Sequence, residues 1–457
     1  RRLDRQVWDC ATTPGQNVCK INFPGNPPHI HGRSEGEPER GPHNWPTMFQ
    51  YGSTDVDKEY ALIQDLSAWV LESFNLNGAN NMGGTGADPP DYPYEQTRTF
   101  AHIEGGTTPP QVPYCPHGAA FYTATGSITH CAWEVYNDIM AHEYAHAIIL
   151  HRYHDGQGNP IGVYYFREPA SLDESHSDIM GEIFEYDRTG YTDWINGSGD
   201  PYGIPFRNLG NPHAVINPVT NLPYPDRYWD ANVYCGNEED GGAHTNSTIP
   251  SHAIYLFARG GEFNGCEIQG QGEQIAKLVS RRVWAHLDRY DGFSRAYTAF
   301  QNACDDLGTL EQCSELTKAL QAVEIDQGGR CSGSAERAPS CAVNHSGNLS
   351  TSTLDGTPSS IFNQGQPFVL NITGATGGRQ MGIYLVPSMG NRPPWQEMAP
   401  LSIVESSINV PIGSQNIRFV FDSDELYGDY EIVVDGNNDG HYQSWADAVT
   451  PIEVVVP

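Results

Sequence analysis

The stretch His142-Glu143-Tyr144-Ala145-His146 decides how the rest of the chain is interpreted. Two histidines four residues apart lie on one face of a helix, so both imidazoles can bind the same zinc ion. Glu143, between them, supplies a carboxylate that can act as a base. Because such pentapeptides also arise by chance, the surrounding sequence has to support this interpretation.

The helix that carries this stretch is expected at residues 138–151, with apolar residues on more than one face, as in a buried helix. Two histidines leave a tetrahedral zinc ion one protein ligand short, with one position open for water. The compact His-Glu-x-x-His-x-x-Gly-x-x-His pattern is excluded, because Ile149 and Arg152 replace its glycine and its last histidine.

A second helix can supply the third ligand. Its sequence is Asp173-Glu174-Ser175-His176-Ser177-Asp178-Ile179-Met180-Gly181. Glu174 and Asp178 are four residues apart, so their carboxylates face the same way. One of them can bind the metal while the other holds a ligand histidine.

Together these motifs resemble the thermolysin-like family of zinc metalloendopeptidases, and the resemblance extends over residues 1–326. The family's Asn-Glu-x-x-x-Asp-Ile-x-Gly motif corresponds to residues 173–181, which implies that Glu174 is the third zinc ligand. Its oxyanion tyrosine, arginine segment and histidine loop are matched, in that order, by Tyr165, Arg207-Asn208-Leu209-Gly210-Asn211-Pro212 and Glu239-Asp240-Gly241-Gly242-Ala243-His244-Thr245-Asn246-Ser247.

The resemblance implies a mechanism. A zinc ion held by His142, His146 and Glu174 lowers the pKa of a bound water toward ~7. Glu143 takes the proton as this water attacks a peptide carbonyl, and then passes it to the leaving amine. His244 and Tyr165 stabilise the oxyanion.

Further residues are expected to support this centre or to bind substrate. Arg207 is expected to bind the substrate carbonyl, with Asp178 holding His142 and the arginine. Asp173, where the family usually has asparagine, holds His146, and Glu239 orients His244. The expected substrate contacts are the arginine, an edge strand and an apolar pocket, formed by Arg207, by Ala119 with Ala120, and by Ile139 with Phe206.

The edge strand departs from the family pattern, because Ala119 replaces an asparagine that binds the substrate backbone. Pairing of a peptide with the main chain of Ala120 would survive this change. The geometry of substrate binding and the preferred peptide length are therefore expected to differ from those of the family.

Calcium is also implied by the resemblance. Asp138, Glu185 and Asp193 fall at positions of the family's calcium ligands, and carboxylate oxygens suit this ion. Two further family ligands are replaced by Ile195 and Ser198, so we expect one ion in place of a pair.

A second calcium site is considered near the C-terminus, where Asp435-Gly436-Asn437-Asn438-Asp439-Gly440 matches the start of an EF-hand loop. Position twelve is Ala446, so Asp447 at position thirteen would have to complete the loop. The candidate ligands are then Asp435, Asn437, Asp439 and Asp447. An ordinary acidic turn is the alternative.

Ten cysteines favour five disulfides and an oxidising compartment. They fall as close neighbours in the chain, which indicates pairs within short loops, although spacing does not prove the pairing. The neighbouring pairs are Cys10 with Cys19, Cys115 with Cys131, Cys235 with Cys266, Cys304 with Cys313, and Cys331 with Cys341.

Composition limits the partners. The formal net charge of −31 argues against nucleic acid or an anionic membrane surface. No apolar run reaches the length of a membrane span, and no signal peptide remains at Arg1. We therefore expect a secreted, processed monomer that acts on proteins or peptides, and the resemblance implies a precursor with a propeptide.

The expected architecture is α+β. Residues 1–326 form a two-lobed catalytic domain, with a β-rich lobe at about 1–130 and a helical lobe at about 131–326. Residues 327–344 are rich in Gly, Ser and Pro and are expected to form a linker, and 345–457 an antiparallel β-sandwich. Helices are expected at 56–74, 273–287, 294–307 and 311–323, and sandwich strands at 367–372, 380–386, 417–421, 430–434 and 452–456.

The favoured function is a secreted zinc endopeptidase that cleaves before bulky hydrophobic residues. An aminopeptidase of the same zinc class is one alternative, although no acidic motif for a free amine stands out. A non-catalytic zinc-bearing adhesin is another, motivated by Ala119 and the C-terminal sandwich.

Overall fold

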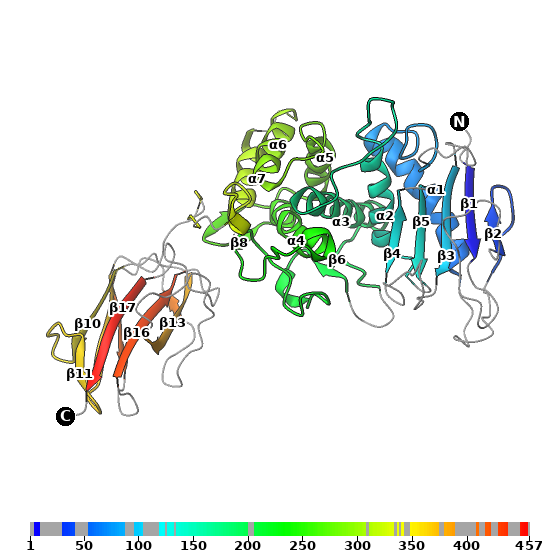
Figure 1. Ribbon diagram of the computed structural model, residues 1–457. Helices are drawn as coiled ribbons and strands as arrows, with labels where there is room; N and C mark the ends of the chain where they lie inside the picture. Colours follow the sequence, from blue (N-terminus) through cyan, green and yellow to red (C-terminus); the bar gives the residue numbers. More distant parts are fainter. Residues whose placement is uncertain are drawn as a thin grey trace. The chain divides into compact units, whose positions relative to one another are not determined.

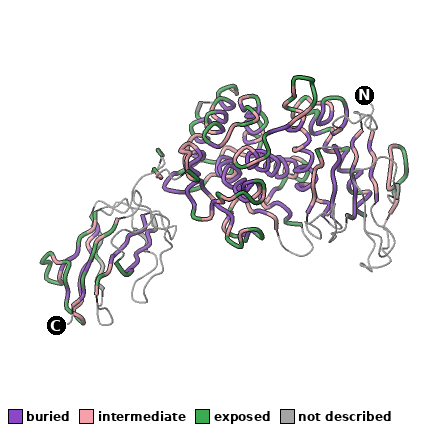
Figure 2. The backbone as a smooth tube through the Cα atoms, viewed as in Figure 1, coloured by how far each residue is buried: buried purple, intermediate pink, exposed green. Residues whose placement is uncertain are grey.

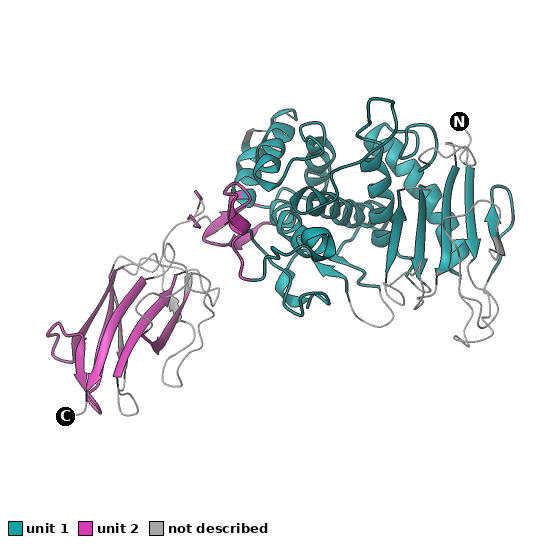
Figure 3. Ribbon diagram, in the orientation of Figure 1, with its two compact units in different colours: residues 1–228, 232–259, 270–320 teal, residues 229–231, 260–269, 321–457 magenta. Residues whose placement is uncertain are grey.

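The protein is described here from a computed structural model of the 457-residue chain. The structure describes residues 4–9, 30–41, 54–86, 96–103, 118–123, 126–131, 134–199, 205–307, 310–332, 336–337, 340–341, 348–373, 379–388, 408–410, 416–421, 428–436 and 448–455. It divides into two compact units, shown in Figure 3. Unit 1 comprises residues 1–228, 232–259 and 270–320, and unit 2 comprises 229–231, 260–269 and 321–457.

A five-stranded mixed sheet forms one side of unit 1, in the order β2-β1-β3-β5-β4. β1 and β5 are both parallel to β3, whereas β2 and β4 are the antiparallel outer strands. The strands are β1 (Asp4–Asp9), β2 (Ile30–Ser34), β3 (Gln96–Ile103), β4 (Ala119–Tyr122) and β5 (Ser127–Cys131). Their blue and cyan arrows lie side by side in Figure 1.

Helix α1 (Asp55–Phe74) packs on this sheet. It buries apolar residues spaced three or four apart, among them Val56, Tyr60, Ile63 and Leu66, which is the period of one helix face. The helix ends at Asn75, whose left-handed backbone (φ 55°) lets its N–H bond to the carbonyl of Leu71.

Helices α2 (Asn137–Leu150) and α3 (Glu168–Thr189) form the centre of unit 1. Figure 2 shows α3 buried along most of its length. The two helices approach closely at Gly181, because a Cβ added there would lie 2.6 Å from the carbonyl oxygen of Asp138. Only glycine fits this contact, which brings the carboxylates of α3 up to the histidines of α2.

Helix α4 (Glu238–Arg259) packs against α3. Its first residues are not an ordinary helix, since Glu239, Asp240, Gly241 and Gly242 all have positive φ angles. The remaining helices of unit 1 are α5 (Glu273–Val283), α6 (Phe293–Asp305) and α7 (Leu310–Ala322). Two short strands, β6 (Ile195–Asn196) and β7 (Arg207–Asn208), pair with each other, and a 3-10 helix η1 covers Pro212–Ala214.

Unit 2 contains a β-sandwich. One sheet has the order β10-β12-β15 and the other β11-β17-β16-β13-β14. Their strands are β10 (Asn348–Thr353), β11 (Ile361–Asn363), β12 (Phe368–Thr373), β13 (Arg379–Pro387), β14 (Ile408–Val410), β15 (Asn416–Phe421), β16 (Gly428–Asp435) and β17 (Ala448–Val455). Residues from both sheets, including Phe368, Leu370, Ile383 and Ile432, share one buried core. Unit 2 also holds the hairpin β8 (Gly261–Phe263) with β9 (Cys266–Ile268), and a 3-10 helix η2 (Arg330–Ser332).

The α+β class predicted from the sequence is confirmed, and every helix and strand range predicted above overlaps an observed element. The prediction that the strands of the sandwich are antiparallel is wrong for one pair of strands, because β11 runs parallel to β17. The domain limits at 326 and 345 stay a prediction. Among the described residues, no helix is both long enough and apolar enough to span a bilayer.

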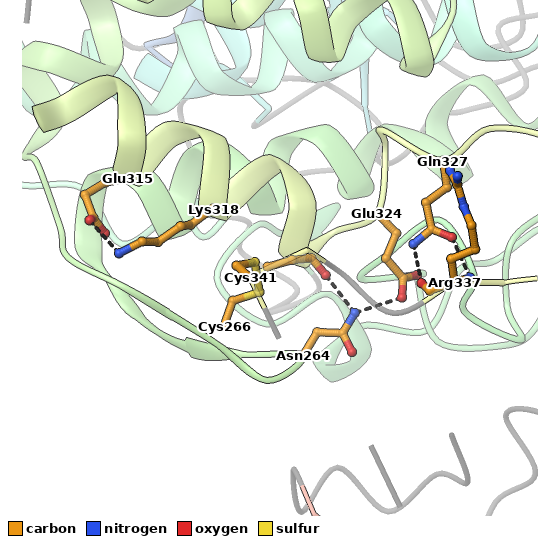
Figure 4. The surroundings of a disulfide bond; sticks show 9 residues. Asn264, Cys266, Glu315, Lys318, Glu324, Gln327, Arg337 and Cys341 are labelled. Carbon is orange, nitrogen blue, oxygen red and sulfur yellow. Dashed lines mark hydrogen bonds and ion pairs between the residues drawn. A yellow bond between two sulfur atoms is a disulfide. The ribbon is translucent and has the colours of Figure 1, made fainter. Parts of the chain in front are cut away.

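Two of the expected disulfides are wrong. Cys266 is bonded to Cys341, 75 residues away, so neither the pair Cys235–Cys266 nor the pair Cys331–Cys341 forms. Beside this bond, shown in Figure 4, the Asn264 side chain donates to Glu324 Oε1 (2.9 Å). Neighbours in sequence do pair at Cys304–Cys313.

The remaining cysteines are only partly described. Cys131, Cys235 and Cys331 are also disulfide-bonded. Cys10, Cys19 and Cys115 lie outside the described residues, so the pairings expected for them stay predictions.

Candidate zinc site

Three side chains from α2 and α3 converge on one point. His142 Nε2 and His146 Nε2 lie 3.1 Å apart. The Glu174 carboxylate completes the group, with Oε2 3.4 Å from His142 Nε2 and Oε1 3.4 Å from His146 Nε2. All three residues were predicted as zinc ligands, and they form one of the clusters whose geometry suits a metal ion.

The donor set fits zinc. Bonds of ~2.0–2.1 Å at tetrahedral angles place neighbouring ligand atoms about 3.3 Å apart, close to the separations found here. Two imidazoles and one carboxylate also match the ligand set of catalytic zinc sites, which leave one position for water or substrate. These residues could therefore hold a zinc ion without rearrangement.

Carboxylates of α3 fix the outer nitrogens of both histidines. Asp178 Oδ1 lies 2.9 Å from His142 Nδ1, and Asp173 Oδ2 lies 3.2 Å from His146 Nδ1. Such contacts orient the rings so that Nε2 faces the metal position. Ser177 Oγ, which sequence analysis missed, also lies 3.2 Å from His146 Nδ1.

The electrostatic field of the site favours positive charge. Burial alone would lower the pKa of His142, but Asp178 and Glu174 outweigh it and raise that pKa to about 10. For His146, burial is likewise outweighed, by Asp173 and Glu174, and the pKa rises to about 9. A cage that stabilises a proton on imidazole in this way also attracts a metal cation.

Asp178 serves two partners at once. Besides contacting His142, it accepts two hydrogen bonds from Arg207, from Nε to Oδ2 (2.7 Å) and from Nη2 to Oδ1 (2.6 Å). Both residues are buried, so this bidentate pair holds the arginine in one orientation. The predicted link between Asp178, His142 and Arg207 is present, whereas the contact of Arg207 with substrate stays a prediction.

Tyr165 and His244 approach the same carboxylate from other segments. The Tyr165 hydroxyl donates to Glu174 Oε1, and His244 Nε2 lies 3.3 Å from that oxygen. Glu239 Oε1 lies 3.2 Å from His244 Nδ1, as the expected orienting residue should. Two candidate hydrogen-bond donors thus stand beside the metal position.

Glu143 lies between the ligand histidines on α2, and its side chain is buried with them. Its charge adds to those of Asp178 and Glu174 in raising the pKa of His142 against the effect of burial. Because α2 is unbroken through residues 142–146, Glu143 is held on the same helix as both ligand histidines, where it can serve as the base.

The expected substrate contacts are less closely grouped. Ala119 and Ala120 lie on β4, the outer strand of the sheet, and pair with His130 and Thr129 of β5. Ile139 is buried in α2. The ring of Phe206 lies over Gly197, where an added Cβ would come within 2.4 Å of it. Their roles in substrate binding stay predictions.

A second group of carboxylates surrounds the junction of α2 and α3. Oxygens of Glu182, Glu185 and Asp193 lie within 4.8 Å of one another. Burial, together with the charges of Asp138 and Asp193, raises the pKa of Glu185 to about 7. Asp138, Glu185 and Asp193 were predicted from the sequence, whereas Glu182 was not. Glu182 lies three residues before Glu185, and this spacing places both side chains on one face of a helix, which could have indicated it.

The C-terminal calcium candidate is mostly outside the described residues. Asp435 is buried at the end of β16. Asn437, Asp439 and Asp447 lie outside the described residues, so this loop stays a prediction.

Comparison with known proteins agrees with this geometry. Residues 162–325 match the family described as the thermolysin metallopeptidase, alpha-helical domain. This region is thermolysin-like. The match contains Tyr165, Glu174, Arg207 and His244, four residues singled out by their motifs, and it confirms the resemblance over residues 162–325.

Curated relatives match somewhat less than half of the chain. Neutral protease B of Bacillus subtilis (strain 168) is 32% identical over 216 residues, which are 46% of this chain and 34% of that protein. Bacillolysin of Brevibacillus brevis is 32% identical over 196 residues, or 41% and 33% of the two chains. The chain thus spans about a third of the length of these relatives.

Among solved structures, the precursor of protealysin, a metalloproteinase from Serratia proteamaculans, is similar at 17% sequence identity and a TM-score of 0.48. The similarity covers 71% of this chain and 88% of that one.

Proposed function

We propose that this protein is a secreted zinc-dependent endopeptidase that hydrolyses internal peptide bonds, preferentially before bulky hydrophobic residues. The observation that carries the proposal is the convergence of His142 Nε2, His146 Nε2 and the Glu174 carboxylate, with Glu143 in the same helix. The thermolysin-like match of residues 162–325 supports the same activity. The disulfides support an oxidising, extracellular compartment.

When bound by His142, His146 and Glu174, zinc acts as a Lewis acid that acidifies water and polarises a carbonyl. Glu143 accepts a proton from the attacking water and later delivers it to the nitrogen of the leaving amine. Glu143 is buried and directly follows the ligand His142 on α2.

Two further side chains act on the developing negative charge of the substrate oxygen. Tyr165 and His244 already direct Oη and Nε2 at the same Glu174 oxygen, so both lie next to the zinc position. Losing one such oxyanion donor typically costs about 2.7–4 kcal/mol in other hydrolases. Arg207 is held by Asp178 and can direct its remaining N–H groups to a substrate carbonyl.

The proposal is tested with an internally quenched peptide blocked at both termini. Glu143→Ala should retain zinc, because Glu143 is not a ligand, and should lose at least about a hundredfold in kcat. Zinc content and kcat are measured on the same preparations of wild type and variant. An aminopeptidase would cleave the peptide only with a free N-terminus, and a zinc-bearing adhesin would not cleave it in either form.

We also propose that the carboxylates of Asp138, Glu182, Glu185 and Asp193 bind calcium. Burial raises the pKa of Asp138 to about 6, and the charge of Asp193 adds to this rise, so a divalent cation there would relieve both effects. Calcium should therefore raise the melting temperature of the wild type, and Glu185→Gln should reduce that rise. An equal response of the two proteins to calcium would rule the site out.

A further inference from the structure

The turn that carries Glu239 has an unusual backbone. Glu239, Asp240, Gly241 and Gly242 have φ angles of 53°, 51°, 80° and 84°, a full left-handed turn before α4 becomes regular. The left-handed region is unfavourable for residues other than glycine, so Glu239 and Asp240 must be held there by other contacts. One such contact is the hydrogen bond from the Arg167 N–H to the Asp240 carbonyl (2.6 Å).

The Glu239 carboxylate is held at both of its oxygens. Oε1 faces His244 Nδ1, and Oε2 accepts a hydrogen bond from the Thr245 hydroxyl. Thr245 is fully buried on α4, directly after His244. By holding Oε2, the hydroxyl orients the carboxylate so that Oε1 faces His244 Nδ1.

Asn217 determines the direction of this hydrogen bond. Its Oδ1 accepts the backbone N–H groups of Val219 (2.7 Å) and Thr220 (3.1 Å), so its Nδ2 has to face the other way. Nδ2 donates to Thr245 Oγ1 at 2.7 Å. Because the hydroxyl accepts from Asn217, its single proton is left for Glu239.

Asn217 is itself fixed by the loop in which it lies. Its main-chain N–H donates to the carbonyl of Leu222 (2.8 Å), and its carbonyl accepts from the N–H of Asn221 (2.8 Å). The Asn217 side chain is fully buried. The amide thus links a rigid loop to α4 through the Thr245 hydroxyl.

We propose that Thr245 and Asn217 are positioning residues for the oxyanion-binding histidine. Through Glu239, the relay Asn217–Thr245–Glu239 sets the ring orientation of His244, so that Nε2 faces the place where negative charge develops. This inference rests on the proposed function. Neither residue touches substrate or metal, and their effect passes entirely through Glu239.

A relay of this kind acts on the transition state more than on substrate binding, because the oxyanion exists only after attack on the carbonyl. Thr245→Val keeps the shape of the side chain and removes the hydroxyl. We expect it to lower kcat by about 10- to 100-fold, somewhat less than the loss of an oxyanion donor itself, with KM within about twofold of wild type.

Thr248→Val is the matched control. Thr248 is also fully buried, lies one turn further along α4, and donates its hydroxyl to the Pro225 carbonyl (2.6 Å). This hydroxyl also lies 3.2 Å from the main-chain carbonyl of Thr245, a contact that does not involve the Thr245 side chain. It should keep the wild-type kcat. Thr245→Ser, which restores the hydroxyl, should recover most of the activity lost in Thr245→Val.

Asn217→Asp provides a second test that preserves the loop. The new carboxylate can still accept hydrogen bonds from the N–H groups of Val219 and Thr220. Its other oxygen, however, replaces the Nδ2 donor and competes with Glu239 for the proton of the Thr245 hydroxyl. We expect kcat to fall to a similar extent as in Thr245→Val, with zinc content and folded structure unchanged.

The relay is overturned if Thr245→Val and Thr248→Val have the same kcat, or if Thr245→Ser is no more active than Thr245→Val. Failure of the proposed function is a different result, because the wild type would then not cleave the blocked peptide at all. If the zinc content of Thr245→Val falls together with its kcat, Thr245 acts on the metal site and not on His244. This result would also overturn the proposal.

Discussion

A single carboxylate, that of Asp178, contacts the imidazole of His142 and the guanidinium of Arg207. All three residues are buried, so each charge depends on its partners in place of water. The Arg207 guanidinium and His142 hold the pKa of this carboxyl below its usual range although burial alone would raise it. Loss of one member should therefore affect both metal binding and folding.

Asp178→Asn is expected to weaken zinc binding by about 10- to 100-fold, because His142 loses the carboxylate that orients it. It should also destabilise unit 1 by about 3–5 kcal/mol, since Arg207 is left buried without its counter-ion. Zinc competition with a chelator measures the first effect, and urea unfolding measures the second.

The matched control is Asp187→Asn, also on α3. Asp187 pairs with Lys277 (2.8 Å) at a partly exposed position away from the zinc ligands. It should cost less stability and leave zinc affinity unchanged. Equal zinc affinity in wild type and Asp178→Asn would contradict the role given to Asp178.

Part of this site could be predicted from spacing alone. His142 with His146, and Glu174 with Asp178, are pairs four residues apart, and helical geometry places each pair on one face. Contacts between segments that are far apart in the sequence could not be predicted in this way, because no spacing pattern marks them. Asn217 meets Thr245 across 28 residues, and nothing near either residue in the sequence indicates the other.

At the scale of elements, the sheet and α1 of unit 1 are joined by a buried charged group. His102 on β3 contacts Asp9 of β1 through Nδ1 (2.9 Å) and Asp55 of α1 through Nε2 (3.3 Å). Burial alone would lower the pKa of His102, but the two carboxylates raise it to about 9. Arg40 also faces Asp9 (3.5 Å), and Lys58 faces Asp55 (3.6 Å).

This group predicts a pH dependence of stability. The pKa of His102 is raised from 6.5 to about 9, so its contribution, roughly 3 kcal/mol, is fully present below pH 6.5 and is lost as the pH rises through about 9. Urea unfolding between pH 6 and 10 should show this loss in the wild type. His102→Gln should be less stable than the wild type at pH 6. Its free energy of unfolding should not show the part of the fall with rising pH that His102 causes. Parallel curves for the two proteins would contradict the assignment.

Element positions were more predictable than their contacts. The apolar period of three to four residues identified α1, α5, α6 and α7 to within a few residues. The left-handed turn before α4 was not predicted, since Glu239, where it begins, is not a residue that favours this conformation. The disulfide Cys266–Cys341 was also missed, because proximity in sequence does not indicate which cysteines meet in the fold.

At the scale of the whole molecule, the chain combines a unit that contains most of the thermolysin-like match, residues 162–325, with a β-sandwich that has a core of its own. The residues proposed to bind zinc and to transfer protons lie in unit 1, on α2, α3 and α4. We therefore expect activity to follow the occupancy of the metal site in unit 1.

The most direct test is a zinc titration of the metal-free protein, followed by cleavage of a terminally blocked, internally quenched peptide. We predict no cleavage without zinc, a linear rise as zinc is added, and a plateau at one zinc ion per chain. His146→Ala should show no such rise. Zinc binding at one equivalent with no cleavage of the blocked peptide would show that the protein is not a zinc endopeptidase.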